Sequence, residues 1–420
     1  MPSRFSPRLI SWIGWTLIVI GVLLLAARMR EITLFASDFT QDYLAAQALR
    51  AGQSIYFATE DLSAKALGMG HSLQSVSPGN NHPPFDAVVF VPLTLLPYDV
   101  AALLWSALSV LLYLFSGYVL LRELGLVLAR HWLVLLTGLA LCWYPFQVHI
   151  ALGQWSILVT ACLILAWLSL RRRRGYLAGL LLGTACLIKL FPGFLLLYLL
   201  LRRHWRAAGA MLLTIAAGGV LTLAAVGADD VIRFFQQVAP GNTAVSGPSA
   251  VNYALTGVFS CLFVDGPEVR PLVVAPQLAA LVIAGSTIGL VGAFVYQAWR
   301  APATPWGEDT AYALACLTMF LVSPITWLHT FPLLALPCGL LVQDWLRGPH
   351  RRLARLSLLA LIWVLFSLPY IQLRFVLSLL YGLERIPWFA AGVLFAPTAG
   401  LVVLWWMIAG RERARPGQPL

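Results

Sequence analysis

The sequence is poor in charge. Only 11% of its 420 residues are Asp, Glu, Lys or Arg, whereas 60% are hydrophobic and the mean hydropathy is +0.82. Soluble domains carry about a quarter charged residues and somewhat under half apolar ones, so this composition excludes an ordinary soluble globule and a disordered chain. An open sheet or a loop cannot lie in hydrocarbon, because each unpaired backbone group there costs several kcal/mol. The sequence therefore predicts an all-α polytopic membrane protein.

Metal and redox motifs are also lacking. The six cysteines are scattered, mostly within apolar runs, and no pair has the spacing of a zinc or redox motif. No cluster of metal-ligating residues is evident along the chain, and Asp229–Asp230 is expected to have a loop or N-cap role. No glycine-rich phosphate cradle, linker or internal repeat stands out. We therefore predict one membrane domain over residues 1–420, without a metal or a cofactor.

The net charge of +11 comes almost entirely from arginine, in short clusters between apolar runs. A protein that follows nucleic-acid phosphates needs a continuous basic face, whereas clusters at the ends of spans follow the positive-inside rule. We predict no nucleic-acid partner and a plasma-membrane protein with both termini in the cytoplasm. Most carboxylates then face outward. Arg4 and Arg8 precede an apolar run that lacks a cleavage site, which favours an uncleaved first span.

Runs of roughly 20 apolar residues suit single crossings, and this chain has room for about twelve. The predicted spans are 10–27, 98–121, 132–150, 155–170, 176–190, 192–204, 207–226, 271–297, 310–325, 331–346, 354–371 and 388–410. The run 176–204 is basic at both ends, so a hairpin turning at Pro192–Gly193 is preferred to a single crossing. Long extracytoplasmic segments remain at 28–97 and 227–270. Long loops in a compact fold are usually functional.

The first long segment contains a short predicted helix with two acids. Ser37 suits its N-cap and Gly52 the residue after its end. Asp38 and Asp42 lie four residues apart and so project from one face. Such a pair often only offsets a helix dipole or meets solvent, but a carboxylate within reach of a hydroxyl group acts as a general base.

A second apolar helix is expected after the paired prolines Pro83-Pro84, which open helices. It is short and bounded by prolines, so we predict that it lies in the membrane interface. His82, just before it, is expected to be an ordinary loop histidine.

Five motifs, in order along the chain, resemble one family. They are Asp38-Phe39-x-x-x-Tyr43-x-Ala45-Ala46 with Gly52 and Ile55-Tyr56; Pro83-Pro84-Phe85 with Pro92 and Leu95-Leu96-Pro97; Gly153-Gln154-Trp155-Ser156; Leu177-Ala178-Gly179 through Leu182-Gly183 to Ile188-Lys189-Leu190-Phe191-Pro192; and Ser323-Pro324-Ile325-Thr326-Trp327-x-His329. Each motif alone is weak, but the five in register resemble the GT87 glycosyltransferases, which depend on polyprenol phosphates.

The resemblance implies a GT-C-type bundle whose first outer loop supplies an aspartate base. Family members are largely α-mannosyltransferases that take the sugar from a polyprenyl phosphate. The expected function is therefore transfer of a hexose, with mannose favoured, from a polyprenyl-phosphate sugar to a glycolipid or glycan acceptor on the outer face. Direct attack on the donor would invert the anomeric centre. Membrane lipids are the remaining expected partners.

The resemblance assigns the base to Asp38 and makes Lys189 the candidate for holding the donor phosphate. A lysine in so apolar a run is costly and therefore a functional candidate, although its amine could instead snorkel to the lipid headgroups. Arg233, Arg270 and Arg374 are alternatives for the phosphate.

Four further residues are expected to bind substrate: Asp42, Tyr43, Gln154 and His329. Asp42 stands where the family often has an aromatic residue, and Thr330 stands where it often has a second histidine. Gln154 and His329 could equally serve as helix-end hydrogen-bonding residues. Asn252 resembles a family motif only vaguely.

Three alternatives to this enzyme remain open. A transporter or lipid flippase predicts charged residues deep in several spans and matching halves. A cell-surface polymer ligase predicts catalytic residues in a large late loop. A purely structural membrane protein does not explain five ordered motifs.

Overall fold

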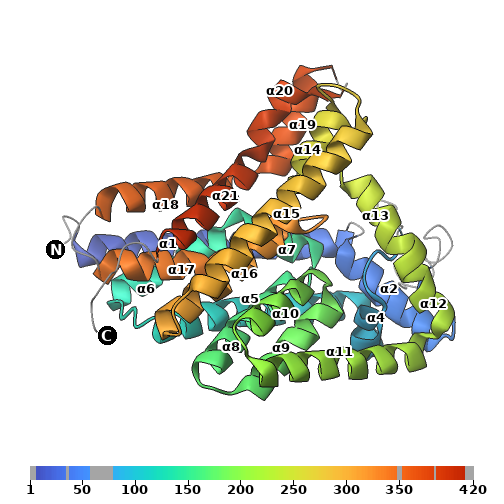
Figure 1. The fold of residues 1–420 in the computed structure, drawn as a ribbon, viewed down its shortest axis with the longest axis horizontal. Coiled ribbons are helices and arrows are strands. Elements are labelled where there is room, and N and C mark those ends of the chain that lie inside the picture. Colours follow the sequence, from blue (N-terminus) through green and yellow to red (C-terminus); the bar gives the residue numbers. More distant parts are fainter. Residues whose placement is uncertain (1–5, 35–36, 57–78, 348–351, 383–384, 412–420) are drawn as a thin grey trace. The chain divides into compact units, whose positions relative to one another are not determined.

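The computed structural model describes residues 6–34, 37–56, 79–347, 352–382 and 385–411, and these are mostly helical (Figure 1). The first half contains α1 (Pro7–Leu34), α2 (Asp38–Arg50), α4 (Pro84–Phe90), η1 (Val91–Leu95), α5 (Tyr98–Glu123), α6 (Arg130–Cys142), α7 (Tyr144–Leu152), α8 (Ser156–Arg171), α9 (Gly175–Ile188), η2 (Phe191–Phe194) and α10 (Leu195–Leu201). The expected all-α fold is confirmed.

The second half continues with α11 (Trp205–Val226), α12 (Ala228–Arg233), η3 (Phe234–Val238), α13 (Ala239–Ser246), α14 (Leu255–Phe263), α15 (Pro276–Arg300), α16 (Pro305–Val322), η4 (Leu328–Leu334), α17 (Ala335–Arg347), α18 (Arg352–Ser367), α19 (Tyr370–Leu380), α20 (Trp388–Ala391), η5 (Gly392–Phe395) and α21 (Ala396–Ala409). Two short strands, β1 (Val269–Arg270) and β2 (Ile386–Pro387), pair in parallel. The second long segment is therefore largely helical.

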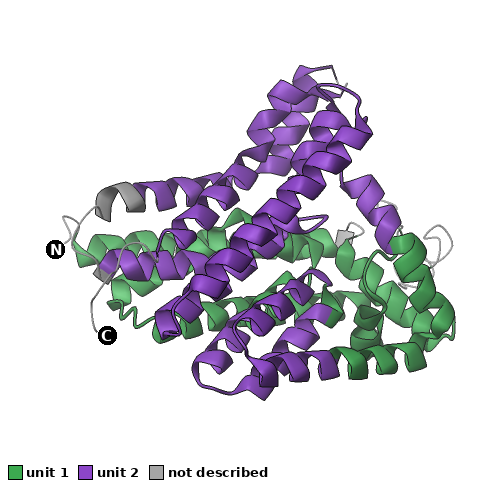
Figure 2. Cartoon of the chain, in the orientation of Figure 1, with its two compact units in different colours: residues 1–162, 187–189, 215–238 green, residues 163–186, 190–214, 239–420 purple. Residues whose placement is uncertain are grey.

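The chain forms two compact units (Figure 2). Unit 1 comprises residues 1–162, 187–189 and 215–238, and unit 2 comprises 163–186, 190–214 and 239–420. The prediction of one domain over 1–420 stays a prediction. Five of the predicted site residues, from Asp38 to Lys189, belong to unit 1, and His329 belongs to unit 2.

Within the described residues, five helical segments are long and apolar enough to cross a membrane: Pro7–Ile32, Tyr98–Glu123, Trp205–Val226, Pro276–Arg300 and Trp388–Ala409. Two bent pairs, 130–152 and 357–380, raise that number to seven if each is one span. A protein with several membrane-spanning helices is thus confirmed, but the count of twelve is not. Apolar runs such as 156–171, 175–188 and 191–201 form helices of fewer than 18 residues, and an apolar run does not report where the helix breaks.

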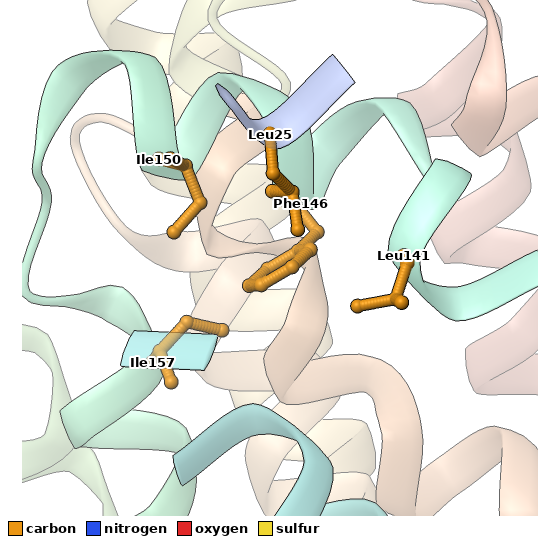
Figure 3. Close-up of a cluster of buried hydrophobic side chains, with 5 residues drawn as sticks. All are labelled: Leu25, Leu141, Phe146, Ile150 and Ile157. Atoms are coloured by element: carbon orange, nitrogen blue, oxygen red, sulfur yellow. The ribbon is translucent and has the colours of Figure 1, made fainter. Parts of the chain in front are cut away.

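In unit 1, α1 and α6 run parallel and lie side by side (Figure 1). A Cβ on Gly14 would lie 2.7 Å from the Leu135 amide nitrogen, and one on Gly138 would lie 2.8 Å from the Gly14 carbonyl oxygen. Small residues of this kind let membrane helices approach closely. A buried apolar cluster joins α1 and α6 to α7 and α8 (Figure 3); it consists of Leu25, Leu141, Phe146, Ile150 and Ile157.

Contacts between α9 and α11 support the predicted hairpin at 176–204. A Cβ on Gly179 would lie 2.2 Å from the Ala207 carbonyl oxygen, and one on Gly183 would lie 2.6 Å from Thr214 Cβ. The α9 and α11 helices are therefore parallel, so the chain between them must return through η2 and α10. The chain leaves α9 at Lys189, before the predicted turn at Pro192–Gly193, which lies in η2.

The basic ends of this hairpin meet acids at the start of α16. Arg171, which precedes the hairpin, donates to Asp309 at 2.5 Å, and Arg202, which ends it, donates to Glu308 at 2.5 Å. Both clusters thus lie at one end of α16, as a hairpin requires.

Candidate active site

The α2 helix begins and ends where the sequence predicts. Ser37 is the N-cap residue of α2, and its amide donates to Thr40 Oγ1 at 3.0 Å. The helix ends at Arg50, and Gly52 adopts a positive φ of 67° just beyond it. Asp38 and Asp42 occupy consecutive turns; Asp38 is half-buried and Asp42 is fully buried.

Asp38 is held by the glutamine of the Gly-Gln motif. Gln154 Nε2 donates to Asp38 Oδ2, and Gln41 Nε2 lies 3.4 Å from Asp38 Oδ1. Gly153, with φ of 64°, makes this approach possible, since a Cβ there would lie 2.5 Å from Phe39 Cβ. Gln154 Oε1 is buried and has no protein partner among the described residues. It can therefore accept a hydrogen bond from a ligand, beside the half-buried Asp38 carboxylate.

Asp42 is engaged at both oxygens. His82 Nδ1 lies 2.7 Å from Asp42 Oδ1, and Trp155 Nε1 donates to Asp42 Oδ2 at 2.9 Å. Tyr56 donates its hydroxyl to the His82 carbonyl oxygen, and Asn80 Oδ1 accepts from the His82 amide. His82 lies in the loop before α4, as expected, but it is buried and is a partner of Asp42 rather than a solvated loop histidine.

Asp86, in the first turn of α4, is a site residue that the sequence reasoning missed. It is completely buried, and neither carboxylate oxygen has a hydrogen-bond partner among the residues that the structure describes. Burial raises the pKa of the Asp86 carboxyl well above its usual range, the Asp42 carboxylate raises it further, and the charge of Lys189 partly lowers it. The signal in the sequence was an acid inside an otherwise apolar helix, directly after the Pro-Pro-Phe motif.

Lys189 belongs to the same neighbourhood. It is half-buried at the break after α9, and its charge acts on both Asp86 and His149. His149, in α7, is also buried, and within the described chain neither ring nitrogen has a partner. The sequence reasoning missed His149 because it lies in an apolar run, where a histidine carries no distinctive pattern.

The three arginines considered as alternatives for binding the phosphate have different surroundings. Arg233 donates to the Tyr56 carbonyl oxygen at 3.1 Å, and Arg374 pairs with Glu268. Arg270 is exposed on the short strand β1. These contacts favour Lys189 among the four cations considered.

Asp230 shows how the second long segment supports the first. Its carboxylate accepts from Ser54 Oγ at 2.6 Å and from the Ile55 amide at 2.8 Å. The expected loop or N-cap role was wrong for Asp230: it lies in the first turn of α12, whose N-cap is Gly227, and it fixes the chain that leads from α2 toward Tyr56.

The remaining predicted residues have separate surroundings. Tyr43 donates its hydroxyl to the Leu96 carbonyl oxygen at 2.7 Å and is almost fully buried. In unit 2, His329 is buried in η4. Asn252 accepts from the Thr326 amide at 2.9 Å and donates to the Pro324 carbonyl oxygen at 3.0 Å, so it fixes the motif that precedes His329.

The chain combines a helical, multi-span fold with buried carboxylates, and comparison with known proteins identifies its class. Residues 81–324, more than half of the chain, match the model of glycosyltransferase family 87. The chain belongs to this family and is a membrane glycosyltransferase, as the five motifs predicted. Family membership disfavours the transporter, ligase and structural alternatives.

Three relatives share most of their length with this chain. It is 28% identical to a polyprenol-phosphate-mannose-dependent α-(1-2)-phosphatidylinositol pentamannoside mannosyltransferase of Mycolicibacterium smegmatis, over 79% of this chain and 77% of the relative. The protein of the same description from Mycobacterium tuberculosis CDC 1551 is also 28% identical, over 80% and 74%. A phosphatidylinositol mannoside mannosyltransferase of M. tuberculosis H37Rv is 25% identical over 97% and 91%.

Among solved structures, ArnT from Cupriavidus metallidurans bound to undecaprenyl phosphate aligns with 95% of this chain and 77% of its own. The TM-score is 0.37 and the identity is 15%.

Proposed function

We propose that the protein transfers mannose from a polyprenyl-phosphate mannose to a glycolipid acceptor, with inversion of the anomeric centre. The observation that carries the proposal is Asp38, a half-buried carboxylate held by Gln154 in a chain of glycosyltransferase family 87. The mycobacterial relatives are described as polyprenol-phosphate-mannose-dependent enzymes that act on phosphatidylinositol mannosides, and these descriptions supply the donor and the acceptor class.

In the proposed reaction, Asp38 accepts the proton of an acceptor hydroxyl as the oxygen attacks the anomeric carbon. The new C–O bond forms while the bond from that carbon to the phosphate oxygen breaks, and the polyprenyl phosphate leaves with the electron pair. A single displacement inverts the centre. A base acts only from within hydrogen-bond reach of the proton that it takes, so Gln154 contributes by holding the Asp38 carboxylate in one orientation.

The Lys189 ammonium is proposed to stabilise the phosphate as its negative charge develops, the work for which a preorganised cation is most effective. Gln154 Oε1 and His329 are proposed to bind substrate hydroxyl or phosphate groups. Asp42 and Tyr43 already bond to protein atoms, so we propose that they shape the site.

The proposed location is the plasma membrane, with the arginine clusters and both termini in the cytoplasm and the site outside. Support comes from the positive-inside rule and from the pairing of Arg171 and Arg202 at one end of α16.

The test is transfer in proteoliposomes that contain polyprenyl-phosphate mannose and extracted glycolipids. Asp38→Asn keeps the size of the side chain and removes the base, so transfer should fall about 100-fold or more. Asp99→Asn, at an exposed carboxylate on α5, is the matched control and should transfer at the wild-type rate. Wild-type transfer by Asp38→Asn would refute the base assignment, and failure of the wild type with every lipid-phosphate sugar would refute the function.

A further inference from the structure

Three buried ligand groups converge in unit 1 beside Asp38. Asp42 comes from α2, His82 from the chain before α4, and Asp86 from the first turn of α4. One carboxylate oxygen of each acid and one ring nitrogen of the histidine all lie within 4.8 Å of one another. The three residues are 0%, 7% and 0% exposed, so none is a solvated surface group.

The burial of the Asp86 carboxylate is not explained by any hydrogen bond within the described part of the protein. Its two carboxylate oxygens are buried and, in the part of the chain that the structure describes, have no hydrogen-bond donor. A buried polar group without a partner costs several kcal/mol, and a buried charge without one costs far more. Asp42 adds a second carboxylate nearby, and Lys189 brings only one positive charge against the two.

We propose that Asp42, His82 and Asp86 bind one divalent metal ion, of the Mn²⁺ or Zn²⁺ type. Two carboxylates and one imidazole are a donor set that suits such ions. Ligand atoms lie about 2.0–2.2 Å from a zinc-sized ion, so no two of them can be more than about 4.4 Å apart. The three ligand atoms all lie within 4.8 Å of one another, so at most a small rotation of a side chain brings them within this limit.

The surroundings of the three ligands resemble the supports that metal ligands require. Trp155 Nε1 orients the second oxygen of Asp42 at 2.9 Å, and Tyr56 and Asn80 hold the His82 backbone. Outer partners of this kind fix ligand orientation and tune affinity. Three protein ligands leave further coordination positions, which water or a substrate oxygen fills.

The competing arrangement has no metal: Asp86 stays protonated in its apolar pocket while Asp42 and His82 form a simple pair. The two arrangements differ in metal content, which can be measured directly. The inference does not rest on the proposed transfer reaction, because the ion would be bound whether or not the enzyme uses mannose.

The experiment uses the full-length protein in detergent, stripped with a chelator and equilibrated separately with Mn²⁺ and with Zn²⁺. Bound metal is counted by mass spectrometry, and Mn²⁺ is also followed by electron paramagnetic resonance. We expect one ion per chain in the wild type and at least about 100-fold weaker binding in Asp86→Asn, which retains the shape of the side chain. Asp38→Asn, one turn from Asp42, is the matched control and should bind one ion.

A thermal unfolding scan accompanies the count. Mn²⁺ or Zn²⁺ should raise the midpoint of the wild type and of Asp38→Asn but not of Asp86→Asn, since an ion stabilises only the fold that binds it. If Asp86→Asn does not fold, His82→Gln takes its place. Wild-type protein that binds neither ion, or Asp86→Asn protein that binds as tightly as the wild type, would overturn the metal site and favour the protonated arrangement.

Discussion

Asp38 and Asp42 are equivalent in sequence, four residues apart on one helix, but their surroundings differ. Asp42 is fully buried with both oxygens bonded to His82 and Trp155, whereas Asp38 is half-buried with Gln154 as its main partner. A carboxylate that must take a proton from a substrate needs access to that substrate. The contacts therefore favour Asp38 as the base and leave Asp42 to organise the residues behind it.

The first prediction at this scale concerns Gln154. Gln154→Ala removes the donor that orients the Asp38 carboxylate, so the turnover number should fall about 10-fold while the Michaelis constant for the acceptor changes little. Loss of orientation lowers the rate of the chemical step more than it lowers ground-state binding.

Gln53→Ala, at an exposed glutamine just after α2, is the control and should retain wild-type kinetics. Steady-state kinetics in proteoliposomes measure both constants. An unchanged turnover number in Gln154→Ala would show that Asp38 is oriented by other groups.

At the scale of elements, glycines decide which helices pack closely. Gly175, Gly179 and Gly183 recur every four residues on α9 and face the backbone and small side chains of α11. Their spacing brings two parallel helices into contact and forces the chain between them to turn back, which places Lys189 at the turn. The proposed phosphate-binding residue is thus positioned by a contact that involves no charged group.

This packing predicts that Gly179→Leu is strongly destabilising. A Cβ at this position would meet the Ala207 carbonyl oxygen at 2.2 Å, and a backbone atom cannot move aside without separating the helices. Overpacking of this kind costs about 1–3 kcal/mol or more.

The midpoint of thermal unfolding in detergent should fall clearly for Gly179→Leu. It should change little for Gly209→Leu, an exposed position on α11 with no neighbour within 4 Å. Equal effects of the two substitutions would contradict the close packing of α9 against α11.

At the scale of the whole molecule, the few acidic residues have different partners in the two units. Acids at the start of α16 and at Asp344 pair with Arg171, Arg202 and Arg411 within unit 2. In unit 1, Asp38 and Asp42 lie on α2 and Asp86 lies on α4. The acids at the start of α16 thus bind basic residues at helix ends, whereas those on α2 and α4 belong to the candidate site.

The Glu308 pair gives the stability of the protein a defined dependence on pH. Burial by itself would raise the pKa of Glu308, but hydrogen bonds from His204 and Arg202, together with their charges, lower it to about 2 from an ordinary 4.5. A depressed pKa means that the folded state binds the proton less readily than the unfolded state. Its contribution is therefore complete above about pH 4.5 and is lost as the pH falls toward 2.

Thermal unfolding from pH 7 to pH 3 should show the midpoint falling below about pH 4.5. The decline should be shallower in Glu308→Gln, which cannot titrate, although that variant is less stable at pH 7. Asp99→Asn, at an exposed acid, should follow the wild-type curve. A decline of equal steepness in Glu308→Gln would show that another group controls the response to acid.

The sequence by itself determined the local features of this protein. Hydropathy located the apolar helices, Ser37 and Gly52 marked the ends of α2, and the basic residues around 176–204 indicated the hairpin. Five motifs in order identified the family and directed attention to Asp38, Gln154 and Lys189. These inferences succeed because capping, hydropathy and turn formation depend on residues close together in the chain.

Only the tertiary structure decided which of these residues meet. The bond between Asp38 and Gln154 spans 116 residues of sequence, that between Asp42 and Trp155 spans 113, and His82 lies 40 residues from Asp42. The sequence shows Asp86 only as an acid in an apolar helix, and its importance appears when its burial and its lack of a partner among the described residues are known. The number of continuous spans could not be predicted for the same reason. The hydropathy of a run reports how favourably its residues transfer into hydrocarbon. Helix breaks depend instead on packing between distant segments.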